Sequence, residues 1–160
     1  MKFEAKSASE AMHIAGLRSV AMLDYLERSG VFVRTQRRHG GRGIRRRYDF
    51  RDLLVLRVIA TLLRNGASVA SVKEALIQFQ SERWQADPAS LGHGKEIIRY
   101  LVVSGRSIYF ATSKDNLYDL TNQCQLAFSF LIDLDALHSE VCAKVTQREF
   151  DFLTASGKEA

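Results

Sequence analysis

Apolar residues recur at helical spacing in two short segments near the N-terminus, and each segment is closed by a glycine. The first segment ends at Gly16, and Glu10 stands three residues beyond Ser7, as in a capping box. The second segment ends at Gly30, and glycine suits the left-handed position that follows a helix. Ser7 or Ser9 can cap the first helix, and the second is predicted to begin at Arg18 or Ser19. Two short helices joined by a tight glycine turn predict a helix-turn-helix.

A short β-rich run follows at residues 31–33, and residues 44–48 can form its partner strand. Gly40, Gly41 and Gly43 lie between the two runs. We call residues 31–48 the wing segment, because this pattern predicts a β-hairpin wing. Its tip is rich in arginine.

Two further helices are predicted after the wing segment. Asp49 or Asp52 opens the third helix, which ends at Asn65 and Gly66, and Ser68 caps the fourth. Their periodic apolar residues are Leu53, Leu56, Ile59, Ala60 and Leu63 in the third helix, and Val69, Val72, Leu76, Ile77 and Phe79 in the fourth.

The hydrophobic period changes after residues 85–94, a stretch that contains the only proline of the chain. The residues that follow are rich in β-branched and aromatic side chains, and a glycine turn at Gly105 predicts a second hairpin. The predicted elements are strands at residues 97–103, 107–112 and 126–132 and an amphipathic helix at residues 134–145.

These patterns predict an α+β protein of two parts. The first is a winged helix-turn-helix of four helices and a β-hairpin wing, and the second is a small αβ domain. The expected boundaries are residues 1–84 for the winged helix-turn-helix, 85–95 for a linker, 96–152 for the αβ domain and 153–160 for a frayed tail. A length of 160 residues suits one domain or two small ones.

Charge divides the chain in the same way. Residues 1–80 carry 15 Lys and Arg against 7 Asp and Glu, a net charge of +8, whereas residues 81–160 carry 8 against 11, a net charge of −3. Seven arginines and no acidic residue fall within residues 34–47. Like charges at this density repel one another, which favours a phosphate backbone as the partner over a solvated loop without one.

The second predicted helix is the candidate recognition helix, because an α-helix fits the major groove of DNA and presents the side chains of its first turns. Arginine stays charged, and its planar guanidinium can clasp phosphate oxygens or enter a narrow minor groove. The candidate DNA-binding residues are Arg18, Ser19, Ala21 and Met22 for base edges, Tyr25 for the sugar-phosphate backbone, and Arg34, Arg37, Arg38, Arg42, Arg45, Arg46, Arg47 and Tyr48 in the wing. Two plainer interpretations stand beside these. The helical face could be an ordinary amphipathic surface, and Tyr48 and Phe50 could pack the wing onto the helices.

The order and spacing of these features resemble the MerR family of winged-helix regulators over roughly residues 8–80. The matching residues are Gly30, Arg46, Tyr48, Asp52, Leu53, Leu56, Ile59, Gly66, Val69, Val72 and Leu76. The family's recognition helix usually reads Leu-Arg-Tyr-Tyr, whereas residues 23–26 read Leu-Asp-Tyr-Leu, so Asp24 stands where the family has a phosphate-binding arginine. The resemblance implies a dimer that reads paired DNA half-sites, with the second half of this chain as the dimerisation part.

Enzymatic, metal-binding and membrane classes find no support in the sequence. It has no G-x-x-x-x-G-K loop and no G-x-S-x-G elbow, and helix capping explains the paired carboxylates Asp133 and Asp135. The residues considered and set aside as metal ligands are Cys124, Cys142, His13, His39, His93 and His138. No apolar stretch approaches the roughly 20 residues of a membrane helix, and the N-terminus has no secretory signal. We therefore expect a cytoplasmic protein with reduced thiols, no cofactor and no enzymatic activity.

The leading prediction is a dimeric, sequence-specific transcriptional regulator that binds double-stranded DNA. A second class is an antitoxin-like interaction protein, whose acidic C-terminal half binds a partner protein while the N-terminal half controls its own expression. A third is an accessory protein that bends DNA. All three share the DNA-binding first half.

Overall fold

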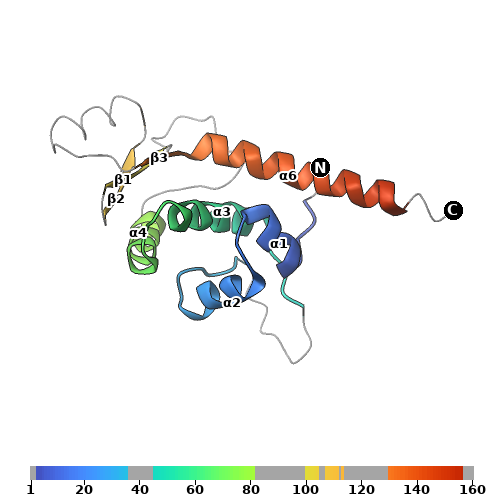
Figure 1. The fold of residues 1–160 in the computed structure, drawn as a ribbon, viewed down its shortest axis with the longest axis horizontal. Helices are drawn as coiled ribbons and strands as arrows, with labels where there is room; N and C mark the ends of the chain where they lie inside the picture. The colour runs from blue at the N-terminus through green and yellow to red at the C-terminus, as the bar shows by residue number, and fades with distance from the viewer. Residues whose placement is uncertain are drawn as a thin grey trace.

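The computed structural model describes residues 3–35, 45–81, 100–104, 107–111, 113 and 130–156. Its elements are α1 (Ala8–Ala15), α2 (Val20–Arg28), α3 (Phe50–Arg64), α4 (Val69–Ser81), β1 (Tyr100–Ser104), β2 (Ser107–Ala111), β3 (Phe130–Asp133) and α6 (Leu134–Ser156) (Figure 1). Helices and a small antiparallel sheet share the fold, so the predicted α+β class is confirmed.

The helices begin where the capping signals predict. Ser7 and Glu10 form a capping box at α1, in which each side chain accepts a hydrogen bond from the other residue's backbone N–H. Asp49 and Asp52 form the same arrangement at α3. Ser19 caps α2, since its hydroxyl accepts a bond from the N–H of the third helical residue at 3.2 Å. These side chains bind N–H groups that have no partner within the helix.

The end of α2 corrects one prediction. Gly30 has φ +71°, and the next two N–H groups, of Val31 and Phe32, both donate to the carbonyl of Leu26 at 3.1 Å. Both side chains are buried in the core. The strand predicted over residues 31–33 is therefore wrong: these residues are apolar because they close the end of a helix and fill the core beneath it.

The predicted partner strand also pairs differently in the described part of the wing segment. Tyr48 forms an isolated antiparallel bridge with Lys6, with N–H to carbonyl distances of 2.8 and 2.9 Å. The strand partner is thus the chain before α1. The predicted tip, with Gly40, Gly41 and Gly43, lies outside the described residues, as does Ile44.

The second hairpin is confirmed. β1 pairs antiparallel with β2, and Ser104 lies opposite Ser107 across the predicted turn. β3 pairs with the other edge of β1, which gives the order β2-β1-β3. The predicted start of the third strand, residues 126–129, lies outside the described residues, and β3 runs one residue past the predicted end, to Asp133.

The last helix is longer than predicted. It continues past residue 145 to Ser156, so residues 153–156 are helical where we expected a frayed tail. The prediction stopped where the apolar spacing stopped. However, residues 146–156 contain neither glycine nor proline, the two residues least favourable to a helix, and the first of either after residue 134 is Gly157.

One hydrophobic cluster joins the two parts of the chain. α3 lies at its centre, and α6 crosses α3 and α1 on the side opposite α2 (Figure 1). Its buried members include Leu53, Leu56, Ile59 and Leu62 from α3, Leu101, Val103 and Ile132 from the sheet, and Leu137, Val141 and Val145 from α6. The division at residues 84 and 96 stays a prediction, and the linker lies outside the described residues.

In α4, Ile77 is 62 % exposed instead of buried, because Val72 and Ala75 occupy the inward face of the helix.

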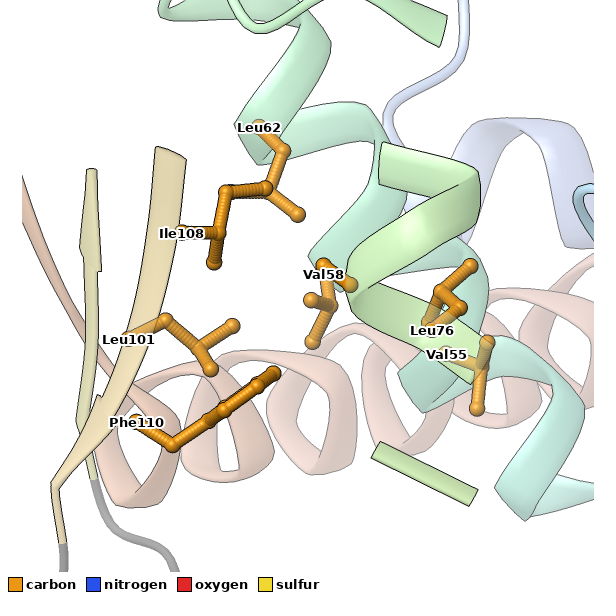
Figure 2. A pocket seen from close by; sticks show the side chains of 8 residues that line it. Val55, Val58, Leu62, Leu76, Leu101, Ile108 and Phe110 are labelled. Carbon is orange, nitrogen blue, oxygen red and sulfur yellow. The ribbon is translucent and has the colours of Figure 1, made fainter. Parts of the chain in front are cut away.

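The junction between helices and sheet is tightly filled. Side chains from α3, α4, β1 and β2 converge there: Val55, Val58, Leu62, Ala75, Leu76, Leu101, Ile108 and Phe110 (Figure 2). The space left between them is about 10 Å³. That is about the room of one water molecule, to which an apolar lining offers no hydrogen-bond partner. This contact is therefore a packed seam and leaves no room for an organic ligand.

Candidate nucleic-acid interface

One face of α2 and the turn before it point away from the core. Leu23 and Leu26 are fully buried in the hydrophobic cluster, so helical periodicity turns the opposite face of α2 outward. The outward residues are Arg18, Ser19, Ala21 and Tyr25, and Tyr25 is 45 % exposed. Met22 is half-buried and packs against the core. Of the five residues predicted for α2 and its cap, four are accessible and one is shared with the core.

A groove lies beside the beginning of α2. It has a volume of about 380 Å³ and is lined by Gly16, Leu17, Arg18, Ser19, Met22, Ala60, Leu63 and Arg64. Arg64 comes from the last turn of α3 and donates to the Gly16 carbonyl at 3.1 Å. Two guanidiniums therefore border a hollow at the positive end of a helix dipole, which favours an anion. We missed Arg64 in the sequence; its only local signal is a cation just before the Asn65 turn.

The other end of α2 carries acidic side chains that bind wing arginines. Arg46 forms ion pairs with Asp24 at 2.5 Å and with Glu27 at 3.5 Å. Arg34 lies 3.4 Å from the Glu27 carboxylate. Asp24, which stands in place of the family's arginine, is thus a partner for a wing arginine. Ion pairing raises the pKa of Arg46 against the opposing effect of burial.

The remaining predicted wing arginines divide into two groups. Arg45 and Arg47 are exposed, and Arg47 donates to the Ala5 carbonyl at 3.0 Å. Arg37, Arg38 and Arg42 lie outside the described residues. Within the described part of the wing, Arg45 and Arg47 are therefore the arginines whose charge faces solvent without an acidic partner.

Tyr48 lies wholly inside the corner between the wing segment and α3. It is fully buried, stacks on Phe32 with ring centroids 6.4 Å apart, and donates its hydroxyl to Glu27 at 2.6 Å. The Arg34 guanidinium lies over its ring at 5.8 Å. Burial and the hydrogen bond to Glu27 raise the pKa of this hydroxyl well above its usual range. This placement favours the interpretation in which Tyr48 packs the wing over the one in which it contacts DNA.

Asp52 ties the wing segment to α3. One carboxylate oxygen accepts bonds from the Thr35 N–H at 2.8 Å and hydroxyl at 3.0 Å, and the other accepts the Asp49 N–H at 3.1 Å. The side chain is buried, and burial raises its pKa although these hydrogen bonds oppose the shift. The sequence showed Asp52 only as a helix-start signal. Its hold on Thr35 depends on tertiary placement.

The described residues contain no group of three or more His, Cys, Asp or Glu that could hold a metal ion. His13 is exposed, and the Cys142 thiol lies 3.8 Å from His138 Nδ1 one helical turn away. Asp133 caps α6, as predicted, by accepting bonds from the N–H groups of Asp135 and Ala136. None of the helices in the described ranges has the length and apolar character to cross a membrane. His39, His93 and Cys124 lie in the undescribed segments.

Comparison with known proteins gives an independent match for the first half. Residues 7–78 match the family described as MerR HTH family regulatory protein. The chain is 30 % identical over 122 residues to HTH-type transcriptional regulators of Mycobacterium bovis and Mycobacterium tuberculosis, whose names describe them as uncharacterized. The matched part covers 76 % of this chain and 50 % of each relative, so the chain spans about half the length of the curated relatives it matches.

Proposed function

We propose that this chain, whose residues 7–78 belong to the MerR helix-turn-helix family, is a sequence-specific DNA-binding transcriptional regulator that presents α2 to the major groove. The observation that carries the proposal is the outward face at the start of α2, where Arg18 and Ser19 stand beside a groove bordered by Arg64. The proposal assigns the protein no enzymatic activity and places it in the cytoplasm, with DNA.

We divide the predicted DNA-binding residues according to the exposure and partners of their side chains. Arg18, Ser19 and Ala21 are accessible at the beginning of α2, where a recognition helix touches base edges. Arg45 and Arg47 are exposed in the wing segment and suit phosphate contacts, and we extend this role to Arg37, Arg38 and Arg42. Arg34, Arg46 and Tyr48 hold the wing against α2, because their polar groups face Glu27 and Asp24.

The test is a selection of bound duplexes from a random pool, repeated with Arg18→Ala. Loss of a base contact is expected to relax the preference at one position by about 1–3 kcal/mol and to leave binding to unrelated DNA nearly unchanged. Arg51→Ala is the matched control, an exposed arginine outside α2 and the wing segment. Failure of the wild-type chain to enrich any sequence contradicts the proposal. An equal loss on all duplexes moves Arg18 to the phosphate contacts.

The second half is proposed to join two copies of the chain. β2 and β3 are the edge strands of a three-stranded sheet, and uncovered edges favour pairing with another chain. A two-fold dimer would place two α2 helices on paired half-sites. Sedimentation of the full chain at micromolar concentration is expected to give a dimer, and a monomer contradicts this part. A protein that co-purifies in stoichiometric amount would instead support the antitoxin-like class.

A further inference from the structure

The turn between α1 and α2 is built around two guanidiniums from α3. Arg57 Nη1 lies 3.4 Å from the Ala15 carbonyl, and Arg64 Nη2 lies 3.1 Å from the Gly16 carbonyl. These carbonyls end α1, where the helix dipole is negative, so cations stabilise them. A Cβ atom on Gly16 would lie 2.5 Å from Arg57 Nη1 and 3.1 Å from Arg64 Nη2. The two guanidiniums therefore occupy the space beside Gly16, whose φ of +76° also favours glycine, and the turn sets the direction in which α2 leaves.

Arg57 is held in turn by α6. Its Nη2 lies 2.5 Å from a carboxylate oxygen of Glu140, a residue 83 positions further along the chain. The Arg57 side chain is only 11 % exposed, and Glu140 is its only acidic partner in the described part of the chain. A guanidinium this buried needs its counter-charge, because an unpaired buried charge is costly.

Cations outnumber anions around this link. Lys144 lies one helical turn after Glu140, and burial followed by the charge of Arg57 lowers the pKa of Lys144, with Arg64 adding to the effect and Glu140 opposing it. Among these residues Glu140 carries the one negative charge, and its ion pair is with Arg57. Without the Glu140 charge, the three cations would repel one another next to the Ala15 and Gly16 carbonyls.

We infer that Glu140 and Arg57 form a positioning link through which α6, which lies outside the family match, sets the placement of α2 on DNA. The inference rests on the proposed function. Neither residue is a DNA contact: Arg57 acts on the turn, and Glu140 acts on Arg57. Base contacts require accurate placement of α2, whereas phosphate attraction tolerates displacement. Loss of the link should therefore reduce discrimination between DNA sequences more than it reduces binding itself.

The test measures affinity for a selected site and for unrelated duplex DNA at one salt concentration, together with hydrogen exchange of the Leu17 amide. This N–H donates to the Met12 carbonyl at 3.0 Å and reports whether the last turn of α1 stays closed. Glu140→Gln is expected to lower the ratio of specific to non-specific affinity by about tenfold and to accelerate Leu17 exchange. Glu74→Gln, the same charge loss at an exposed position of α4, is expected to change neither.

Two further variants keep the test decisive. Lys144→Gln in the Glu140→Gln background removes one surplus cation and is expected to restore part of the ratio, because it relieves the repulsion left by the lost carboxylate. Glu140→Asp keeps the negative charge on a shorter side chain, and it replaces Glu140→Gln in the same measurements if Glu140→Gln fails to fold. Wild-type discrimination and wild-type Leu17 exchange in Glu140→Gln overturn the inference. If the wild-type chain selects no sequence at all, the proposed function fails, and the exchange measurement still decides whether the link holds the turn.

Discussion

The two ends of α2 lie in opposite electrostatic surroundings. At its beginning, Arg18 and Arg64 border an open groove, and no acidic side chain of the described residues pairs with either. At its end, Asp24 and Glu27 bind Arg34 and Arg46 over the buried ring of Tyr48. One end has positive charge available to a polyanion, while the charges of the other end are satisfied within the fold. The difference teaches that a count of arginines in a basic segment overstates the number whose charge is left without an acidic partner in the fold.

The largest expected effect on the free energy of unfolding comes from removing the aromatic ring of Tyr48, which is buried at the C-terminal end of α2. Tyr48→Ala deletes a fully buried aromatic side chain and leaves Glu27 without its hydroxyl donor. Loss of the ring is expected to lower the free energy of unfolding by about 3–5 kcal/mol. Tyr25→Ala, at an exposed position of the same helix, is expected to change it by less than about 0.5 kcal/mol. Urea denaturation of both variants measures the contrast, and equal losses would break the comparison.

A smaller loss of stability is expected from replacing the acidic residues at the C-terminal end of α2. Glu27 has a side chain only 16 % exposed and faces Tyr48, Arg34 and Arg46. Glu27→Gln should therefore destabilise the fold by about 2–3 kcal/mol, because it leaves Arg34 without an acidic partner among the described residues and Arg46 with Asp24 alone. Asp24→Asn, at a more exposed position, is expected to cost about 0.5–1 kcal/mol. A reversed order in denaturant titrations would show that Asp24 is the principal partner.

The predictable part of this fold is local, and the difference between the two ends of α2 shows why. Ser7, Ser19 and Asp49 act on N–H groups a few residues away, so the sequence reveals their roles. The roles of Arg46 and Arg57 depend on acids that tertiary folding brings to them.

The error at residues 31–33 has the same origin. Val31 and Phe32 satisfy a strand pattern, but the carbonyl that binds their N–H groups belongs to Leu26 at the end of α2. β propensity describes a half-buried surface and does not distinguish a sheet from a helix end packed in the core. Conversely, the second hairpin was predictable because the two β-rich runs on either side of Gly105 pair with each other.

Substitution of the exposed wing arginines should change the salt dependence of DNA binding, whereas substitution of the ion-paired ones should change the free energy of unfolding. Replacing Arg45 and Arg47 with Ala together is expected to weaken binding alike on all sequences and to make the slope of log affinity against log salt shallower by about 0.9 for each lost phosphate contact. The free energy of unfolding should change by less than about 0.5 kcal/mol per substitution. Arg46→Ala is the comparison variant and should lower stability through its loss of Asp24 and Glu27. An unchanged slope in the double variant would remove Arg45 and Arg47 from the interface.

A further variant separates the contribution of the Tyr48 hydroxyl from that of its ring. Tyr48→Phe keeps the buried ring and removes the donor to Glu27, so it should destabilise the fold by about 1–2 kcal/mol at neutral pH. Burial and Glu27 raise the pKa of the folded-state hydroxyl above its ordinary value of 10.0, so the folded state favours the protonated form. The stability this gives is fully present below about pH 10 and is lost as the pH rises through the folded-state pKa. The wild type should thus approach Tyr48→Phe in stability above pH 10, as measured by urea titration at neutral and alkaline pH. A difference between the two proteins that stays constant across this range would show that the Glu27 hydrogen bond does not govern the ionisation of Tyr48.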